Sequence, residues 1–401
     1  MASTSYNYVI VGAGLAGTSA VAGIRERDKE GSILLINSEN HLPYDRPPLS
    51  KKLWFGKKKV EDILLQKEEF YELNGVALTI GVSIKSLDAE GKTVTDSLGR
   101  TYHFKKLLLA TGGIPRTLPI QNGTMADICY FRTLNDYTRI RKDAIEGKSA
   151  VVIGGGFIGS ELAAALVVNK IQVTMIFSAP YLAHHIFPEY LGKAIQNQYQ
   201  LRGITVLAND MPTGFAKNGR KFVTYTRANK TVESDLVIVG VGIAPSIELA
   251  RSAGLQTANG IVVDAQLQAS LPDIYAAGDI AFFHYQALGK QMRIEHWDNA
   301  ANQGKIAGRN MAGAHEPYTY MPYFFSDLFE FGYEAVGEVD ASLETVADWE
   351  KENDTGVIYY LRDGRVRGAM MCNVWDKVEA ARDIIRRTER IPKLELRGAI
   401  R

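Results

Sequence analysis

The chain has 401 residues, of which 46% are hydrophobic and 23% charged, with a formal net charge of +1. A chain of this length exceeds one typical hydrophobic core and predicts two or three domains. The balanced charge argues against a nucleic-acid-binding protein, which needs an excess of Lys and Arg. No apolar run reaches the roughly 18 residues that predict a membrane span.

A glycine-rich turn follows the first predicted strand. The strand is Tyr8–Val11, the turn runs from Gly12 to Gly17, and a helix at Thr18–Glu26 and a strand at Ile33–Ile36 follow. In G-x-G-x-x-G the first glycine makes the bend, the second lets the backbone approach a pyrophosphate, and the third allows close helix–strand packing. The helix N-terminus adds free N–H groups for phosphates. Glu39 lies where an acid binds the ribose of an adenosine.

A stiff segment with two cations follows the first nucleotide-binding pattern. It reads His41-Leu-Pro-Tyr-Asp-Arg-Pro-Pro-Leu-Ser-Lys51, and its prolines hold it extended. Arg46 and Lys51 project from it. A rigid segment that carries cations beside a phosphate-binding turn is a candidate clamp for a flavin nucleotide.

The same strand–turn–helix pattern recurs later in the chain. The strand Ala150–Ile153 leads into the turn Gly154–Gly159. Buried strands that end in glycine are also predicted at Leu107–Ala110, Leu236–Val239 and from Ile274 to Gly278. One such turn is a weak signal, but two indicate two dinucleotides held in one molecule. The second pattern interrupts the first, whose remaining strands resume after it.

The pattern of predicted secondary structure changes beyond Pro317. Antiparallel strands are predicted at Val336–Val339, Gly356–Arg362 and Arg365–Met371, with Arg362-Asp-Gly-Arg365 as a hairpin turn. A helix is predicted at Val378–Thr388.

The two cysteines, Cys129 and Cys372, form no CxxC pair and no zinc spacing. We therefore expect no redox disulfide and no metal site, so that electrons must pass directly from a flavin to the acceptor.

Several longer stretches resemble one known family. They are Leu42–Trp54, Ala110–Arg116, Gly154–Glu161, Ala276–Asp279, Arg293–Asn299, Phe325–Leu328, Gly332–Gly337 and Tyr359–Arg362. Together, in this order, they resemble the flavoprotein reductases of the ferredoxin-reductase type, which have a glutathione-reductase-like fold with two dinucleotide sites. The apoptosis-inducing factor branch and its microbial relatives are the most similar.

The resemblance implies an α/β fold with two Rossmann-like domains and a C-terminal α+β domain. The FAD-binding domain would be discontinuous, at 1–120 and 244–316. The NAD(P)H-binding domain would occupy 121–243, and the C-terminal domain 317–401.

Carried over position by position, the resemblance implies a set of FAD contacts. They are Gly12, Ala13, Gly14, Leu15, Ala16, Gly17, Glu39, Arg46, Lys51, Val82, Ala110, Thr111, Gly112, Arg116, Gly278, Asp279, His296 and Trp297. Asp279 would bind the ribityl chain, and the backbone of His296 and Trp297 would meet the pyrimidine edge of the flavin.

A second set would bind the nicotinamide nucleotide. It comprises Gly155, Gly156, Phe157, Ile158, His185, Gly242, Glu295 and His296, with Phe325, Glu334 and Asn373 approaching from the C-terminal domain. The resemblance also places Lys51 and Glu161 beside the N5 edge of the flavin as catalytic residues. A cation there favours the negatively charged reduced ring, and a carboxylate holds the lysine in position. Alternatively, Glu161 is a first-turn helix residue that interacts with the helix dipole.

The choice between NADH and NADPH stays open. The strand after the second turn ends Met175-Ile-Phe-Ser-Ala179, with no acid for a ribose diol and no arginine for a 2′-phosphate. His184 and His185 either reach such a phosphate or are ordinary loop residues. NADH is favoured, because phosphate recognition normally uses an arginine fork.

The expected reaction is hydride transfer from NAD(P)H to FAD, followed by electron transfer to a small iron–sulfur protein such as a ferredoxin or rubredoxin. Two alternatives remain: a quinone, oxygen or another small acceptor, or a redox-sensing role like that of apoptosis-inducing factor. We expect a cytoplasmic protein, because the first strand begins by Tyr8 and leaves no room for a targeting segment. It is expected to be a monomer or a homodimer, and the sequence does not decide between them.

Overall fold

The computed structural model describes residues 4–387 and 389–400. Its internal contacts divide the chain into two compact units. The first comprises residues 1–45, 60–114 and 244–322, and the second residues 46–59, 115–243 and 323–401. The short strands β7 (Gly113–Pro115) and β16 (Ile243–Pro245) lie where the chain passes from one unit to the other. The predicted domain limits stay a prediction.

The first unit contains a mainly parallel sheet. Its order is β3-β2-β1-β6-β5-β4, with β19 also paired to β6. The parallel strands are β1 (Thr4–Val11), β2 (Ile33–Ile36), β3 (Val76–Thr79), β6 (Thr101–Leu109) and β19 (Ile274–Ala276). Antiparallel β4 (Ile84–Asp88) and β5 (Thr93–Asp96) extend it. Because parallel strands end at one edge, the turns after β1 and β6 and the residues after β19 lie together.

Helices and short strands complete the first unit. The helices are α1 (Leu15–Arg27), α2 (Glu68–Leu73), α6 (Glu248–Ser252) and α7 (Trp297–Met311), with 3₁₀ turns at Val60–Ile63 and Gln286–Leu288. A smaller sheet contains β17 (Thr257–Ala258), β18 (Gly260–Val262), β20 (Ala281–Tyr285) and β21 (Lys290–Met292). Helix α1 begins at Leu15, three residues before the predicted start, because Gly14 is its N-cap.

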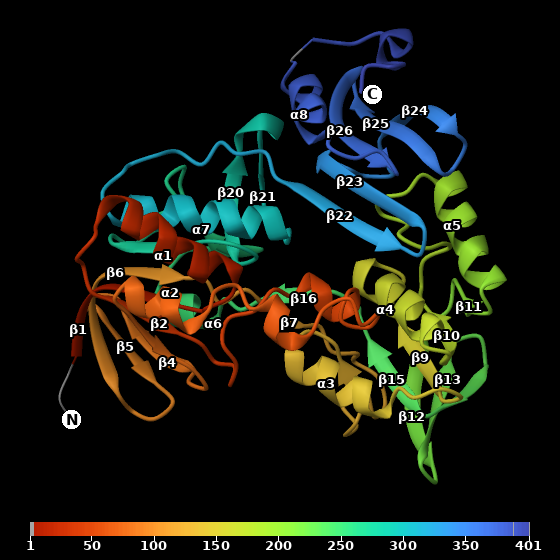
Figure 1. Ribbon diagram of the computed structural model, residues 1–401, viewed down its shortest axis with the longest axis horizontal. Coiled ribbons are helices and arrows are strands. Elements are labelled where there is room, and N and C mark those ends of the chain that lie inside the picture. Colours follow the sequence, from red (N-terminus) through yellow and green to blue (C-terminus); the bar gives the residue numbers. More distant parts are fainter. Residues whose placement is uncertain (1–3, 388, 401) are drawn as a thin grey trace. The chain divides into compact units, whose positions relative to one another are not determined.

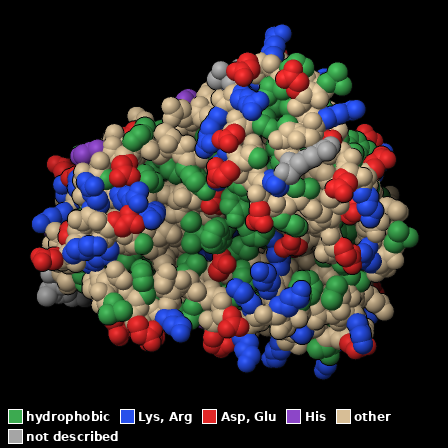
Figure 2. Space-filling view, turned by 45° about the horizontal axis from the view of Figure 1, so that its top comes forward, with side chains coloured by type: hydrophobic (Ala, Val, Ile, Leu, Met, Phe, Trp, Pro, Cys, Tyr) green, Lys and Arg blue, Asp and Glu red, His purple; other side chains and the backbone are tan. Residues whose placement is uncertain are grey.

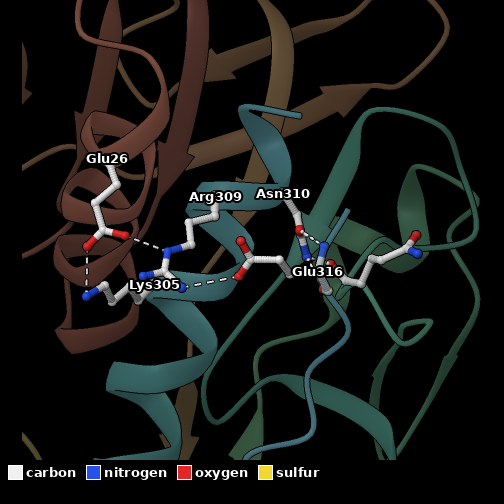
Figure 3. Close-up of polar contacts among 6 residues, drawn as sticks. Glu26, Lys305, Arg309, Asn310 and Glu316 are labelled. Atoms are coloured by element: carbon white, nitrogen blue, oxygen red, sulfur yellow. Dashed lines mark hydrogen bonds and ion pairs between the residues drawn. The ribbon is translucent and has the colours of Figure 1, made fainter. Parts of the chain in front are cut away.

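Helices α1 and α7 lie side by side with their backbones in contact (Figure 1). A Cβ atom on Gly304 would lie 2.1 Å from the carbonyl oxygen of Ala16, and one on Gly308 would lie 2.2 Å from that of Ala20. At the far end of α1, Glu26 accepts hydrogen bonds from Lys305 and Arg309 (Figure 3). This packing fixes α7 against the helix that begins at the first glycine turn.

Replacing Gly304 by Ala is expected to destabilise the protein, by about 1–3 kcal/mol. Helix propensity alone predicts the opposite sign, a gain of up to about 1 kcal/mol. The new Cβ would however press against the Ala16 carbonyl oxygen. Urea unfolding measures the difference, with Ser19→Ala on the half-buried side of α1 as a near-neutral control. A more stable Gly304→Ala variant would contradict the close contact.

The second unit begins with a parallel sheet in the order β11-β10-β9-β15-β8. Its strands are β8 (Cys129–Tyr130), β9 (Ser149–Ile153), β10 (Gln172–Ile176), β11 (Thr205–Leu207) and β15 (Leu236–Val239). The helices are α3 (Leu134–Asp143), α4 (Phe157–Val168) and α5 (Glu189–Leu201), with a 3₁₀ turn at Pro47–Ser50. An antiparallel sheet of β12 (Pro212–Asn218), β13 (Lys221–Thr226) and β14 (Thr231–Ser234) packs on it through Phe215 and Phe222.

The C-terminal part of the second unit is an antiparallel sheet in the order β22-β23-β26-β25-β24. Its strands are β22 (Tyr323–Leu328), β23 (Phe331–Gly337), β24 (Glu344–Lys351), β25 (Thr355–Arg362) and β26 (Arg365–Cys372). Helix α8 (Val378–Arg386) and a 3₁₀ turn at Lys393–Leu396 follow. Thr388, the last residue of the predicted helix, lies outside the described residues. The predicted α/β fold class with a C-terminal α+β part is confirmed.

The strand predicted at Val336–Val339 is wrong in its limits. Strand β23 ends at Gly337, whose φ is +78°, so the chain leaves the sheet there. The next residue, Glu338, is buried and paired with Arg362 and Arg367 instead of extending the strand.

On the face seen in Figure 2, Lys and Arg side chains alternate with Asp and Glu side chains, as the near-neutral net charge predicts.

Candidate nucleotide-binding sites

The first glycine turn has the geometry of a phosphate site. A Cβ on Gly12 would lie 2.3 Å from the Ala110 carbonyl oxygen, and one on Gly17 would lie 1.9 Å from that of Gly12. By contrast, a Cβ on Gly14 would meet no heavy atom within 4 Å. Gly14 is also the N-cap of α1 and provides no side-chain cap. The outer glycines are therefore required by packing, while the middle one leaves free space before the amides of a helix N-terminus.

The second turn repeats this arrangement in the other unit. A Cβ on Gly154 would lie 2.3 Å from the Gly240 carbonyl oxygen, and one on Gly159 would lie 2.0 Å from that of Gly154. Gly156, the uncapped N-cap of α4, again faces open space. Phe157 and Ile158 follow it and are 40% and 37% exposed. Each unit thus contains one cradle that the pyrophosphate of a dinucleotide fits.

Other expected FAD contacts of the first unit gather around its turn. The Ala110 N–H donates to the Val11 carbonyl. A Cβ on Gly278 would lie 3.0 Å from that of Ala16, and the Gly278 N–H donates to Gln303. Thr111 and Gly112, which follow Ala110, hydrogen bond to Ser246. The edge of the sheet therefore brings together three segments that are far apart in the sequence.

Glu39 and Val82 lie beside one another at the end of β2. The Gly81 N–H donates to the Glu39 carbonyl, and the Val82 N–H donates to the Asn37 carbonyl. Tyr44 donates its hydroxyl proton to the Glu39 carboxylate at 2.5 Å. This arrangement suits the adenosine end of a dinucleotide, with an acid for the ribose and an apolar residue for the base.

The segment that leads into α7 contains Asp279, Glu295 and His296, and Trp297 is the first residue of the helix. Arg293 connects Asp279 with Glu295, because its Nη1 atom donates to the Asp279 carbonyl at 2.8 Å and lies 2.6 Å from the Glu295 carboxylate. His296 is the N-cap residue of α7. Burial lowers the pKa of His296 to about 4, so its imidazole is neutral near pH 7. The Trp297 indole N–H donates to Asp45 at 2.7 Å.

Two further expected FAD contacts, Arg46 and Arg116, lie in the second unit. Arg46 donates to the Arg132 carbonyl at 2.8 Å. The Arg116 N–H donates to the Gly242 carbonyl, which places this residue beside an expected nicotinamide contact.

A buried ion pair joins Lys51 and Glu161 in the second unit. The Lys51 Nζ atom lies 3.0 Å from Glu161 Oε1, and the two side chains are 8% and 6% exposed. Lys51 follows the 3₁₀ turn at Pro47–Ser50, and Glu161 lies in the second turn of α4. The structure therefore brings together two predicted residues that are separated by 110 positions. It does not support Glu161 as an isolated residue at a helix end.

Three residues of strand β22 surround this pair. Lys51 Nζ lies 4.6 Å from the centre of the Phe325 ring and 3.8 Å from Asp327 Oδ2, while Ser326 donates to Glu161 at 2.6 Å. Ser50 donates to the other Glu161 oxygen at 2.5 Å. Ser50, Ser326 and Asp327 were not predicted as site residues. The only signal was their position in the motifs Leu42–Trp54 and Phe325–Leu328, which assigns no role to them.

The other expected nicotinamide contacts also lie in the second unit, apart from Glu295 and His296. The Ala183 N–H donates to the Gly155 carbonyl, which places the loop with His184 and His185 beside the second turn. No acid follows β10 up to Ala179. Glu334 lies opposite Phe325 across β22 and β23, and burial together with Asp376 raises the pKa of Glu334. Asn373 accepts from the Gly332 N–H.

Neither cysteine belongs to a disulfide, and both thiols are buried. Burial raises the pKa of Cys129 to about 11 and also raises that of Cys372. Among the described residues, no cluster of His, Cys, Asp and Glu side chains is arranged to hold a metal ion. No helix in the described ranges is both long and apolar enough to span a membrane.

The comparisons with known proteins cover nearly the whole chain. Residues 6–304 match the family model described as pyridine nucleotide-disulphide oxidoreductase. Residues 307–355 match the model for the C-terminal region of mitochondrion-associated apoptosis-inducing factor. The resemblance predicted from the sequence is confirmed.

Individual relatives include reductases and an apoptosis-inducing factor. The chain is 33% identical to the ferredoxin–NAD(+) reductase component of the anthranilate 1,2-dioxygenase system of Burkholderia cepacia, over 94% of this chain and 93% of that protein. It is 35% identical to the mitochondrial apoptosis-inducing factor 1 of Dictyostelium discoideum, over 98% of this chain and 81% of that protein. Among solved structures, a chain of the covalent putidaredoxin reductase–putidaredoxin complex matches with a TM-score of 0.90 and 31% identity, covering 96% of this chain and 94% of that one.

Proposed function

Since this chain belongs to the pyridine nucleotide-disulphide oxidoreductase family, we propose that it carries electrons from NAD(P)H through FAD to a ferredoxin- or rubredoxin-like protein. The protein is an FAD-dependent NAD(P)H oxidoreductase. The observation that carries the proposal is the pair of glycine turns, each with packed outer glycines and an open middle one. Relatives named as ferredoxin and rubredoxin reductases support the acceptor.

In this proposal the two units hold different nucleotides. The turn Gly12–Gly17 would hold the pyrophosphate of FAD, Glu39 and Val82 its adenosine, and Asp279 its ribityl chain. The turn at Gly154–Gly159 would hold the pyrophosphate of NAD(P)H. Bound FAD supplies a two-electron acceptor for the nicotinamide hydride and a carrier that releases the electrons to the next protein.

The side chains contribute position and charge rather than covalent chemistry. Lys51 supplies a fixed positive charge where negative charge develops on hydride transfer, and Glu161 holds that lysine. Burial of the pair excludes water and strengthens the field of the ammonium group. Phe325 provides an aromatic face beside Lys51 for the nicotinamide ring.

Anaerobic stopped-flow mixing tests this function. The purified protein is expected to bind FAD without a covalent bond, and NADH or NADPH is expected to bleach its absorbance in one fast phase. Mixing the reduced enzyme with a ferredoxin, a rubredoxin, a quinone or oxygen then identifies the acceptor. A folded protein that cannot be reconstituted with FAD would overturn the proposal. Fast reoxidation by quinone or oxygen alone would replace the proposed acceptor.

The second candidate function is that of a redox sensor, which does not depend on an electron acceptor. The match of residues 307–355 to the C-terminal region of apoptosis-inducing factor favours it. A sensor would be reduced slowly, keep its reduced complex for minutes and change its oligomeric state on reduction. Size-exclusion chromatography with and without NADH separates a sensor from a reductase, and the same runs distinguish the expected monomer and homodimer. A cytoplasmic location is also part of the proposal, and cell fractionation tests it.

Replacing Ala179 by Glu is expected to shift the cofactor preference towards NADH by roughly 1–2 kcal/mol, the scale of a charge-assisted hydrogen bond. Ala179 is half-buried and follows β10, and its methyl group can accept or donate no hydrogen bond. The wild-type preference should therefore be modest, with NADH favoured. The ratio of kcat/KM for NADH and NADPH measures the shift. An unchanged ratio would show that this loop does not meet the adenosine ribose.

Replacing both cysteines by Ala is expected to leave FAD reduction and acceptor turnover within about twofold of wild type. No disulfide relay is available, because both thiols are buried and unpaired. Alanine suits this test better than serine, which would bury a hydroxyl at two positions that are 2% and 0% exposed. Single-turnover reoxidation of the folded double variant provides the measurement. A lost electron-transfer step would indicate a thiol relay.

A further inference from the structure

Two buried serine hydroxyls hold the carboxylate of Glu161. Ser326 donates to Oε1 at 2.6 Å, and Ser50 donates to Oε2 at 2.5 Å. Ser326 is fully buried and Ser50 is 2% exposed. Together with the Lys51 ammonium at 3.0 Å, each carboxylate oxygen therefore has a donor, and one of them has two. A carboxylate with donors from three directions has one orientation.

The two serines come from different parts of the chain. Ser50 ends the 3₁₀ turn directly before Lys51. Ser326 lies on β22, the edge strand of the C-terminal sheet, and α4 with Glu161 packs against this strand. Side chains alternate along a strand. Accordingly, Ser326 is buried while its neighbours Phe325 and Asp327 are half-buried and exposed.

Lys51 has more than one carboxylate within reach. Glu161 lies 3.0 Å from its Nζ atom, and Asp327 lies 3.8 Å away with a side chain that is 52% exposed. A lysine ammonium is a point charge on a flexible stem, so its position depends on which partner is better fixed. The serines fix Glu161 and not Asp327. They therefore keep the charge of Lys51 in the buried position instead of the solvent-exposed one.

We propose that Ser50 and Ser326 are positioning residues for hydride transfer, which hold Glu161 and through it the ammonium group of Lys51. The C-terminal strand β22 then contributes a positioning residue to flavin reduction. This inference rests on the proposed role of Lys51 and Glu161. It does not depend on the identity of the electron acceptor, because neither the reduction rate nor the midpoint potential measured below involves the acceptor.

The test is a double-mutant cycle between Ser326 and Lys51 in the FAD-loaded enzyme. Ser326→Ala is combined with Lys51→Met, and the rate of flavin reduction and the flavin midpoint potential are measured for all four proteins. Ser326→Ala alone is expected to slow reduction about tenfold, the scale of one hydrogen bond to a charged group. It is also expected to lower the midpoint potential. With Met at position 51 the same change should have no further effect on either quantity.

Three companion variants make the result specific. Ser326→Thr keeps the hydroxyl and should recover most of the rate and potential. Ser234→Ala removes an equally buried serine hydroxyl of β14, which donates to the Leu236 carbonyl at 2.9 Å and not to Glu161. It should change neither quantity. A Ser50→Ala variant should behave like Ser326→Ala if both serines act on one carboxylate.

The outcomes separate this inference from the proposed function. Equal losses from Ser326→Ala with Lys and with Met at position 51 would overturn the inference, since the serine would then act through the fold alone. The inference would also be overturned if Ser326→Ala kept the wild-type reduction rate and midpoint potential while Lys51→Met was impaired. An unimpaired Lys51→Met enzyme would instead remove the proposed role of the ion pair. Failure to reduce a ferredoxin or rubredoxin would affect only the proposed acceptor.

Discussion

Lys51→Met is expected to slow the reduction of bound FAD by NAD(P)H about 100-fold, the usual scale for loss of one donor that stabilises developing charge. Its buried ammonium group is the positive charge that the proposal places at the reacting edge of the flavin. Met keeps the length and the apolar stem, so the packing around position 51 is preserved. The flavin midpoint potential should fall, because less positive charge stabilises the reduced state. FAD itself should still bind.

Glu161→Gln is expected to have a smaller effect, because it loosens the lysine without removing its charge. The double variant should then lose less than the sum of the two single losses, as for residues that act as one unit. Stopped-flow reduction rates measure all three. Lys52→Met serves as the control, since Lys52 is the exposed neighbour of Lys51. Strictly additive losses would mean that the two side chains work independently.

The parts of this site that the sequence predicts are local in the chain. The turn Gly12–Gly17 and its repeat at Gly154–Gly159 include a strand end, a bend and a helix start within a few residues. The strand Leu236–Val239 was predicted with its limits unchanged in β15. Local sequence patterns are sufficient to predict these elements, because all the residues that define each pattern lie within one short segment.

The parts that were missed depend on pairing between distant segments. Ser326 has no local signal, because its role arises only when β22 packs against α4 and brings the hydroxyl to Glu161. The sheet of β12, β13 and β14 was not predicted, since short strands with mixed polarity gain their stability from neighbours. The predicted limits of strand β23 were wrong for a related reason. Its end depends on the positive φ of Gly337 and on the ion pairs of Glu338, which lie outside any strand pattern.

Gly14→Asp is expected to abolish FAD binding without destabilising the apoprotein. The backbone of Gly14 has φ −63° and ψ −172°, which any L-residue adopts, and a Cβ there meets no protein atom. Aspartate is a favoured N-cap residue, so its carboxylate should accept hydrogen bonds from the free amides of α1. Those amides are the ones that a pyrophosphate would use, and the added negative charge repels it.

Gly156→Asp makes the same change at the N-cap of α4, where φ is −88° and ψ is −164°. This variant should keep its FAD but bind NAD(P)H at least about 100-fold more weakly, the loss of one or two hydrogen bonds to charged phosphate. Flavin absorbance of the purified proteins and the NADH dependence of the reduction rate measure the two effects. Each variant is the control for the other, because the substitution and the helix position are the same. The assignment of one dinucleotide to each unit requires the two losses to be separate. If Gly156→Asp released FAD, or if Gly14→Asp kept FAD and lost only NADH, the assignment of the nucleotides would have to be reversed.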